Sequence, residues 1–140
     1  MAVIARFLVD TSAAARMHVP EVAERIAPLI ESGVVASSAV LDAEALYSAR
    51  SPGEYELIWA DRRVAYEYVV TNDEDWARAL DAQRALARTG RHRAVGMPDL
   101  LTGVLAAQNG LTVVHYDADF EIAAEVIDFQ HRWVVPPGTV

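Results

Sequence analysis

Short apolar segments alternate with longer stretches of helical periodicity along this chain, and this alternation is the feature that most restricts its fold. Four segments have the length and composition of buried strands, at residues 6–9, 34–37, 111–116 and 132–135. Between them, apolar residues recur at helical spacing. Strands separated by helices form parallel sheets with helices on both faces. The sequence therefore predicts one three-layer α/β/α domain over residues 1–140, with a central parallel sheet.

Capping residues and helix breakers set the expected helix boundaries. Helices are expected in these stretches: one directly after Thr11 or Ser12 as its cap, then 21–32, 38–50, 54–68, 71–90, 98–110 and one starting near Asp119. Thr71 and Glu74 have the spacing of a capping box. The three acidic residues at 73–75 are therefore assigned to capping and to the helix dipole, not to catalysis.

Four acidic residues lie where an expected strand ends or where a helix packs: Asp10, Glu44, Asp99 and Asp117. The segments FLVD and TVVHYD place Asp10 and Asp117 at the carboxyl ends of strands, and ligands of parallel α/β sheets bind there. Carboxylates gathered at this edge repel one another unless a cation offsets their charge. The pattern predicts a hard divalent cation, Mg²⁺ or Mn²⁺, bound by oxygen ligands.

Each of these aspartates also has a structural explanation. Asp10 can cap the helix after its strand, and Asp99 lies in the first turn of a helix, where acidic groups are favoured. Asp117 and Asp119 can form an Asx-turn and an N-cap. For any one of them taken alone, the structural explanation is at least as good as a role as ligand.

Glu44 is the carboxylate that capping does not explain. It lies three or four residues from Leu41, Val40 and Tyr47, so it is expected on a largely apolar helix face. A carboxylate directed at a core needs a partner or a metal ion, because an unpaired buried charge is costly. Asp42, two residues earlier, is expected to point to the opposite side and to be solvated. We therefore assign Glu44, not Asp42, to the site.

The chain is acidic as a whole but contains one short segment that is rich in arginine. The net charge of −8 argues against nonspecific polyanion binding by the whole surface. The chain has twelve arginines and no lysine, and four arginines gather shortly before Asp99: Arg84, Arg88, Arg91 and Arg93. Arginine binds phosphate in a bidentate manner and stacks on bases, so this stretch is a candidate RNA-binding surface. A solvated helix face explains the cluster equally well.

Other catalytic chemistries find no support in the sequence. With no cysteine there is no disulfide, thiolate metal site or cysteine nucleophile, and this composition fits a cytoplasmic protein. The histidines lack HExxH spacing, and His115 is expected to be a core or rim residue. No G-x-S-x-G elbow, P-loop or GxGxxG motif occurs. No apolar run approaches the roughly 20 residues that span a bilayer, so no membrane association is expected.

Three segments, in their order and spacing, resemble a known family. FLVDTSA, EALYSAR and MPDLLTGVLAAQNGLTVVHYDADFE resemble the PIN-domain ribonucleases, specifically toxins of the VapC type from toxin–antitoxin pairs. The resemblance spans nearly the whole chain, and the YSAR that follows Glu44 fixes its register. The resemblance implies these site residues: the acidic quartet Asp10, Glu44, Asp99 and Asp117, the auxiliary carboxylate Asp119, and a supporting hydroxyl at Thr11 or Ser12.

The resemblance also implies an activity and partners. These are Mg²⁺-dependent endoribonuclease activity on tRNA or another structured RNA, homodimerisation, and inhibition by a cognate antitoxin whose C-terminal segment wraps the toxin. Metal ions activate water and clamp the attacking and leaving oxygens of a phosphodiester. On this basis Asp10 and Asp99 are expected to hold the principal Mg²⁺ and Asp117 to complete or orient its ligands. Glu44 is expected to serve a second metal ion or the attacking water.

Other interpretations have distinguishing features. Receiver domains and haloacid-dehalogenase-like phosphatases also use acidic pockets on α/β sheets, but both need a lysine, and this chain has none. The remaining alternative is a non-catalytic PIN-like module that binds a basic protein partner. Metal-dependent RNA cleavage separates such a module from an enzyme.

Overall fold

The computed structural model of the protein describes residues 3–140, and the strands in this range form one five-stranded sheet. The strands are β1 (Phe7–Val9), β2 (Val35–Ser37), β3 (Glu67–Tyr68), β4 (Thr112–His115) and β5 (Gln130–Trp133). They pair in the order β3-β2-β1-β4-β5, and every pairing is parallel. The chain passes from β1 outward to β3 and then crosses back to β4 and β5. The direction of winding therefore reverses between β1 and β4.

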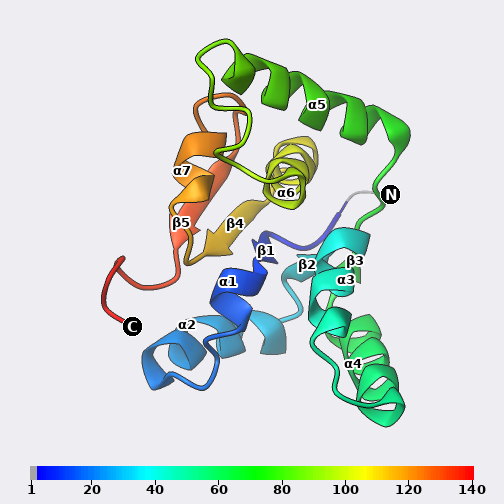
Figure 1. Ribbon diagram of the computed structural model, residues 1–140. Coiled ribbons are helices and arrows are strands. Elements are labelled where there is room, and N and C mark those ends of the chain that lie inside the picture. Colours follow the sequence, from blue (N-terminus) through cyan, green and yellow to red (C-terminus); the bar gives the residue numbers. More distant parts are fainter. Residues whose placement is uncertain (1–2) are drawn as a thin grey trace.

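Helices cover both faces of this sheet. They are α1 (Thr11–Ala14), α2 (Pro20–Glu31), α3 (Ala39–Tyr47), α4 (Pro52–Ala65), α5 (Asp73–Ala87), α6 (Met97–Asn109) and α7 (Asp119–Ala123). In Figure 1, α5 and α6 lie above the sheet and α2 lies below it. The predicted three-layer α/β/α architecture with a parallel sheet is confirmed. Across residues 3–140, no helix is both long enough and apolar enough to cross a membrane.

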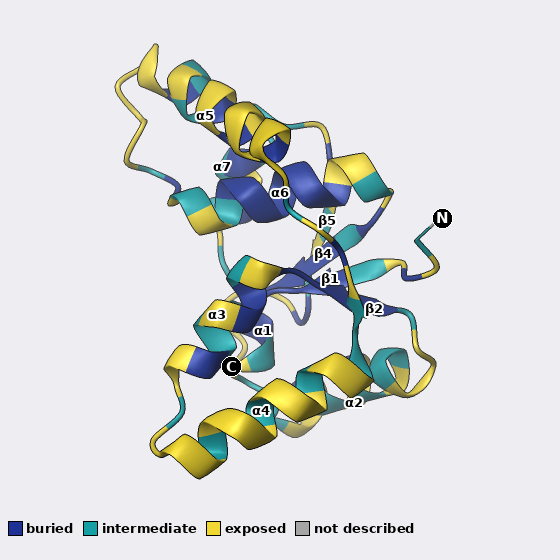
Figure 2. Cartoon of the chain, turned by 90° about the vertical axis from the view of Figure 1, so that its right-hand side faces the viewer, coloured by how far each residue is buried: buried dark blue, intermediate teal, exposed yellow. Residues whose placement is uncertain are grey.

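Two apolar clusters hold the layers together. Alternation along the strands sends Leu8 and Val113 to the face covered by α6, and Val9 and Val114 to the face covered by α2. Figure 2 shows the middle of α6 buried, whereas α4 is mostly exposed. The buried helix α6 carries Asp99 in its first turn, so the core fixes the position of this carboxylate.

The strand β3 was not expected. The helix expected over residues 54–68 ends at Ala65, and Tyr66 is extended, with φ −121° and ψ 144°. The next two residues pair with β2 instead of continuing the helix. The helical prediction for residues 66–68 is wrong because an edge strand of two residues has no periodicity of its own.

The capping box of α5 lies one residue later than expected. Asn72 and Asp75 form it, rather than Thr71 and Glu74. Asparagine ranks above threonine as an N-cap, which accounts for the shift. The assignment of the acidic residues in the first turn of α5 to capping is confirmed for Asp75.

Several other boundaries differ by two or three residues, as the ends of α3 and β5 illustrate. The third expected helix was extended to Arg50, but α3 ends at Tyr47. The last strand was expected from Arg132 and begins at Gln130. Both differences are of the size expected for element ends, where no periodic signal marks the last residue.

Candidate functional site

The candidate site lies where the winding of the sheet reverses. Asp10 directly follows β1, and Asp117 lies two residues after β4, the strand that pairs with β1. The backbone N–H of Asp10 donates to the carbonyl of Val114 at 2.9 Å, so the ends of the two strands are joined. Connections leave this point in opposite directions, which opens the crevice in which parallel α/β proteins bind ligands. The structure brings these two predicted site residues together.

Ser12 fixes the orientation of Asp10. The side chain of Asp10 is buried, and its Oδ2 accepts hydrogen bonds from the Ser12 N–H at 3.0 Å and the Ser12 hydroxyl at 2.7 Å. The same hydroxyl oxygen accepts the Tyr116 N–H at 2.9 Å. Asp10 therefore caps α1, in place of the expected Thr11 or Ser12. Burial raises the pKa of Asp10, the Ser12 hydrogen bonds oppose that rise, and the Asp117 charge adds to it.

Three further carboxylates meet beside Asp10. Asp99, Asp117 and Asp119 each offer an oxygen, and these oxygens lie within 4.8 Å of one another. The Asp119 N–H donates to Oδ1 of Asp117 at 2.9 Å, which is the Asx-turn that the sequence allowed. Asp119 does not serve as the N-cap of α7, because that position belongs to Ala118. The residue expected as an auxiliary carboxylate is therefore part of the central cluster.

The pKa of Asp99 reflects the repulsion between the carboxylates that meet at the site. Burial raises the pKa of Asp99 to about 7, helped by four neighbouring carboxylates: Asp10, Asp117, Asp119 and Glu44. Burial and the Asp117 charge also raise the pKa of Asp119. Asp99 is thus the carboxylate whose pKa is raised by all four of the others.

Glu44 reaches the site from α3. The Thr11 hydroxyl donates to Oε1 of Glu44 at 3.1 Å, which connects α3 to the first turn of α1. Burial raises the pKa of Glu44, the Thr11 hydrogen bond opposes this, and the Asp10 charge adds to the rise. Glu44 is half-buried and not enclosed in the core. It lines an open hollow together with Val40, Ala43 and Tyr47, so the expected apolar neighbours on α3 are present.

Asp42 is the buried carboxylate of α3, contrary to the expectation that it is solvated. Its Oδ1 accepts the Ser37 hydroxyl at 2.6 Å and the Arg62 Nε–H at 2.8 Å. Arg62 comes from α4, so the pair clamps α4 to α3. The partner lies 20 residues away in sequence, and helical spacing around Asp42 carries no sign of it. Asp42 is satisfied by this pair and belongs to the scaffold.

The five site carboxylates have no cationic partner in the part of the chain that the structure describes. The ion pairs found in residues 3–140 all involve other acids: Asp42, Glu54, Glu74 and Glu125. A group of converging oxygens with raised pKa values and no arginine partner fits a hard divalent cation, which takes oxygen ligands. The donor set therefore fits Mg²⁺ or Mn²⁺, and it lacks the nitrogen and sulfur ligands that zinc prefers.

Two histidines support the site from behind, and sequence reasoning missed their pairing. Nδ1 of His115 accepts the Asp117 N–H at 3.2 Å, and its Nε2 lies 2.9 Å from Nδ1 of His131. Burial and the neighbouring His131 lower the pKa of His115 to about 4, so this ring is neutral at neutral pH. The proton on Nε2 then donates to His131. The sequence offered little sign of this pairing, because His131 lies just before the strand expected at residues 132–135 and joins β5 only in the structure.

The predicted arginine cluster lies on α5 and on the loop before α6. Arg84 is exposed on α5, Arg88 is exposed at the C-cap of this helix, and Arg93 is exposed in the loop. Arg91 pairs with Glu125 at 3.2 Å, so part of its charge is offset. None of the four makes an ion pair with a site carboxylate in residues 3–140.

The protein is of the parallel α/β class, with carboxylates gathered where the winding of the sheet reverses and a donor set that fits a divalent cation. Comparison with known proteins identifies a family with this fold. The PIN domain family matches residues 7–126. The chain is 44% identical over 134 residues to ribonuclease VapC21 of Mycobacterium tuberculosis, covering 96% of this chain and 97% of that one. The chain therefore belongs to the PIN-domain family and, within it, to the VapC-type ribonucleases.

Solved structures show the same fold. A chain of the DNA-bound VapBC complex from Salmonella typhimurium matches with a TM-score of 0.73 and 17% identity, covering 94% of this chain and 99% of that chain. VapBC-5 of Mycobacterium tuberculosis, described as a member of the VapBC family of toxin–antitoxin systems, matches with a TM-score of 0.57 and 21% identity. That match covers 92% of this chain and 97% of the other.

In metal-free protein, Asp99 is expected to contribute less stability as the pH rises from about 4 to about 7. The folded state holds the Asp99 proton up to about pH 7, whereas the unfolded chain releases it near 3.8. Ionising Asp99 in this window therefore favours unfolding, and the effect levels off above it. We predict that Asp99→Asn raises the Tm in EDTA at pH 8, and that this gain shrinks toward pH 4. Thermal unfolding followed by circular dichroism measures both.

Added Mg²⁺ is the control for this prediction. At pH 8 it should raise the Tm of the wild-type protein more than that of Asp99→Asn, because the variant lacks one of the charges that the cation neutralises. Equal Tm values for the two proteins in EDTA at pH 8 would contradict the raised pKa.

Proposed function

We propose that this protein is a metal-dependent endoribonuclease that hydrolyses RNA phosphodiester bonds, with tRNA or another structured RNA as substrate in the cytoplasm. The observation that carries the proposal is the cluster of Asp99, Asp117 and Asp119 beside Asp10, with no cationic partner in residues 3–140. The relative named ribonuclease VapC21 supports the choice of RNA.

Mg²⁺ or Mn²⁺ would be held by the cluster and by Asp10. When bound, such an ion supplies charge neutralisation at the phosphate and a more acidic water. The residues of the chain prepare its binding. Ser12 occupies Oδ2 of Asp10, which leaves the other oxygen for the site. Asp99 must release its proton to become a ligand, so cation binding is expected to weaken below about pH 7.

Glu44 has the properties of a group that accepts a proton from water. Its Oε1 is held by the Thr11 hydroxyl, and its other oxygen is free of hydrogen bonds within residues 3–140. Burial and the Asp10 charge raise the pKa of Glu44, which increases its basicity relative to an ordinary carboxylate. This arrangement fits the predicted role of Glu44 toward the attacking water.

We also propose that the protein is a toxin whose cognate antitoxin binds and inhibits it, within a hetero-oligomer built on a toxin homodimer. The similar solved structures include VapBC complexes, and one is described as a member of the VapBC family of toxin–antitoxin systems. A net charge of −8 suits a partner segment that is basic.

Site variants should abolish cleavage without unfolding the protein. Purified wild-type protein is expected to cut RNA at discrete positions with Mg²⁺ and to stop in EDTA. Asp10→Asn and Asp99→Asn should both lose cleavage, because each removes a charge from the cation site, whereas Asp73→Asn at the start of α5 should retain it. Sequencing of RNA ends measures the cut positions. If wild-type protein leaves RNA intact but binds a basic partner, the non-catalytic alternative is correct.

The two acids of α3 provide a matched pair of variants. Glu44→Gln should lower the cleavage rate at least about 100-fold, the usual contribution of a positioned base, with stability nearly unchanged. Asp42→Asn should do the reverse. It weakens the ion pair with Arg62 and should lower the free energy of unfolding by about 2 kcal/mol, with cleavage per folded molecule retained. Denaturant unfolding and initial rates separate the two effects, and an inactive, fully stable Asp42→Asn would refute the assignment.

The arginine cluster before α6 is proposed to contact RNA phosphates outside the catalytic carboxylates, through Arg84, Arg88, Arg91 and Arg93. Arg93 has no ion-pair partner in residues 3–140, whereas the charge of Arg91 is partly offset by Glu125. Replacing Arg91 and Arg93 by Gln should weaken RNA binding and flatten its salt dependence. An unchanged salt slope would identify these arginines as a solvated surface.

A further inference from the structure

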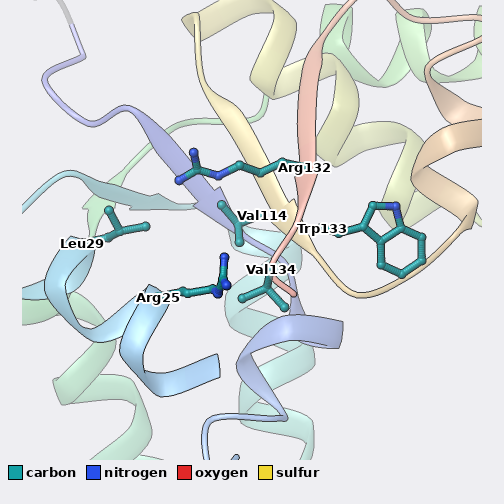
Figure 3. A pocket seen from close by; sticks show the side chains of 6 residues that line it. All are labelled: Arg25, Leu29, Val114, Arg132, Trp133 and Val134. Atoms are coloured by element: carbon teal, nitrogen blue, oxygen red, sulfur yellow. The ribbon is translucent and has the colours of Figure 1, made fainter. Parts of the chain in front are cut away.

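A cavity of about 250 Å³ opens on the sheet face opposite α6, between α2 and β5. Its floor includes Val114 of β4 and Val134, which follows β5, and both valines belong to the apolar cluster on this face. Arg25 of α2 and Arg132 of β5 lie at its rim, and both are exposed (Figure 3). The cavity therefore combines an apolar floor with two cationic side chains.

The two arginines approach the same patch of the sheet. In Figure 3, the guanidinium group of Arg25 points toward Val114, and Arg132 extends from β5 across β4 toward β1. The guanidinium carbon of Arg132 lies 4.7 Å from the centre of the Phe7 ring, which holds this side chain in place. In the described range, no carboxylate lies within 4.0 Å of either guanidinium group.

Arg25 stays unpaired although its own helix offers a carboxylate. Glu21 precedes Arg25 by four residues, which is the favourable order for an ion pair on a helix. The same spacing and order produce a contact of 3.0 Å between Glu74 and Arg78 on α5. No such pair joins Glu21 and Arg25 in the structure. The guanidinium group is directed at the cavity instead.

We propose that this cavity binds a phosphate group held jointly by Arg25 and Arg132. Two guanidinium groups that share a cavity without a carboxylate create a local positive charge in a protein whose net charge is −8. The planar donors of arginine match phosphate oxygens in a bidentate manner. The valine floor offers no hydrogen-bond partner to compete for those donors, so an anion gains more there than on an open surface.

The backbone of bound RNA is the source of phosphate that the position of the cavity favours, and this choice of source rests on the proposed function. The side chain of Val114 lines the cavity, and its carbonyl accepts the N–H of Asp10 at 2.9 Å. The cavity is thus next to the acidic centre, formed by Asp10, Asp99, Asp117 and Asp119, but it opens on the face of the sheet that α2 covers. Arg16 lies at this edge as well, with its guanidinium carbon 4.4 Å from the centre of the Tyr116 ring. An RNA strand that extends from the acidic centre around the carboxyl edge of the sheet would reach the cavity with Arg25 and Arg132.

RNA binding by non-cleaving protein tests the proposal. Arg25→Gln/Arg132→Gln is introduced into Asp99→Asn, and affinity for a single-stranded RNA is measured at several salt concentrations. The affinity should fall about tenfold or more, and the slope of log K against log salt should decrease by roughly 0.7 for each phosphate that the variant no longer neutralises. Arg50→Gln/Arg78→Gln removes the same charge from two helix ion pairs elsewhere and should leave both quantities near those of the parent.

Single variants keep the test valid if the double variant does not fold. Arg25 makes no ion pair within residues 3–140, so Arg25→Gln should fold normally and show part of the decrease in affinity. Arg132→Lys keeps the charge but lacks the bidentate donors, and it should bind RNA more weakly with an unchanged Tm.

Inorganic phosphate distinguishes the two sources of the ligand. Phosphate that raises the Tm of wild-type protein but not of the double variant, with RNA affinity unchanged, would support a site for free phosphate. Unchanged RNA affinity together with no phosphate-dependent shift would overturn the proposal. Failure of the proposed function is a separate result, because it appears as the absence of EDTA-sensitive RNA cleavage by wild-type protein.

Discussion

The hydrogen bonds of Ser12 are the interaction on which the geometry of the acidic centre depends. Its N–H and hydroxyl hold one oxygen of Asp10, and the hydroxyl oxygen accepts the N–H of Tyr116. One small side chain therefore joins the ends of β1 and β4 at the point where the winding reverses. Because neutral hydrogen bonds position the carboxylate, no arginine is needed to hold it. The negative charge is thereby left for a cation.

The apolar core makes this concentration of charge tolerable. Asp99 is followed directly by Leu100 and Leu101, which are 0% and 1% exposed, so the first turn of α6 cannot move away from the other carboxylates. Burial and repulsion then appear as raised pKa values, to about 7 for Asp99. The site stores unfavourable electrostatic energy that a bound cation relieves, and the packing of α6 against the sheet supplies the stability that opposes it.

The layers, and the position of the candidate site residues at one edge of the sheet, could be predicted from the sequence because both depend on local patterns. Alternating segments define the parallel sheet, and the residues that end β1 and β4 must meet when those strands are neighbours. What failed depends on interactions between residues that are distant in sequence. Asp42 is buried because Arg62 of α4 forms an ion pair with it. Glu44 is held at the rim of the site because Thr11 of α1 donates a hydrogen bond to it. The two-residue strand β3 and the pairing of His115 with His131 likewise exist only through neighbours across the sheet.

The charge of −8 requires that RNA be bound by local features rather than by the average field of the protein. At physiological salt, charges more than about 8 Å apart are largely screened, so a phosphate experiences mainly the groups next to it. On one side of the carboxyl edge of the sheet those groups are carboxylates, which attract a phosphate only through a cation. On the other side they are Arg25 and Arg132. Salt acts on these two sides differently: it weakens arginine–phosphate contacts, while it also screens the repulsion between RNA and the acidic surface. The salt dependence of RNA binding is therefore a difference between two opposing effects, and a small net slope would be compatible with several direct phosphate contacts.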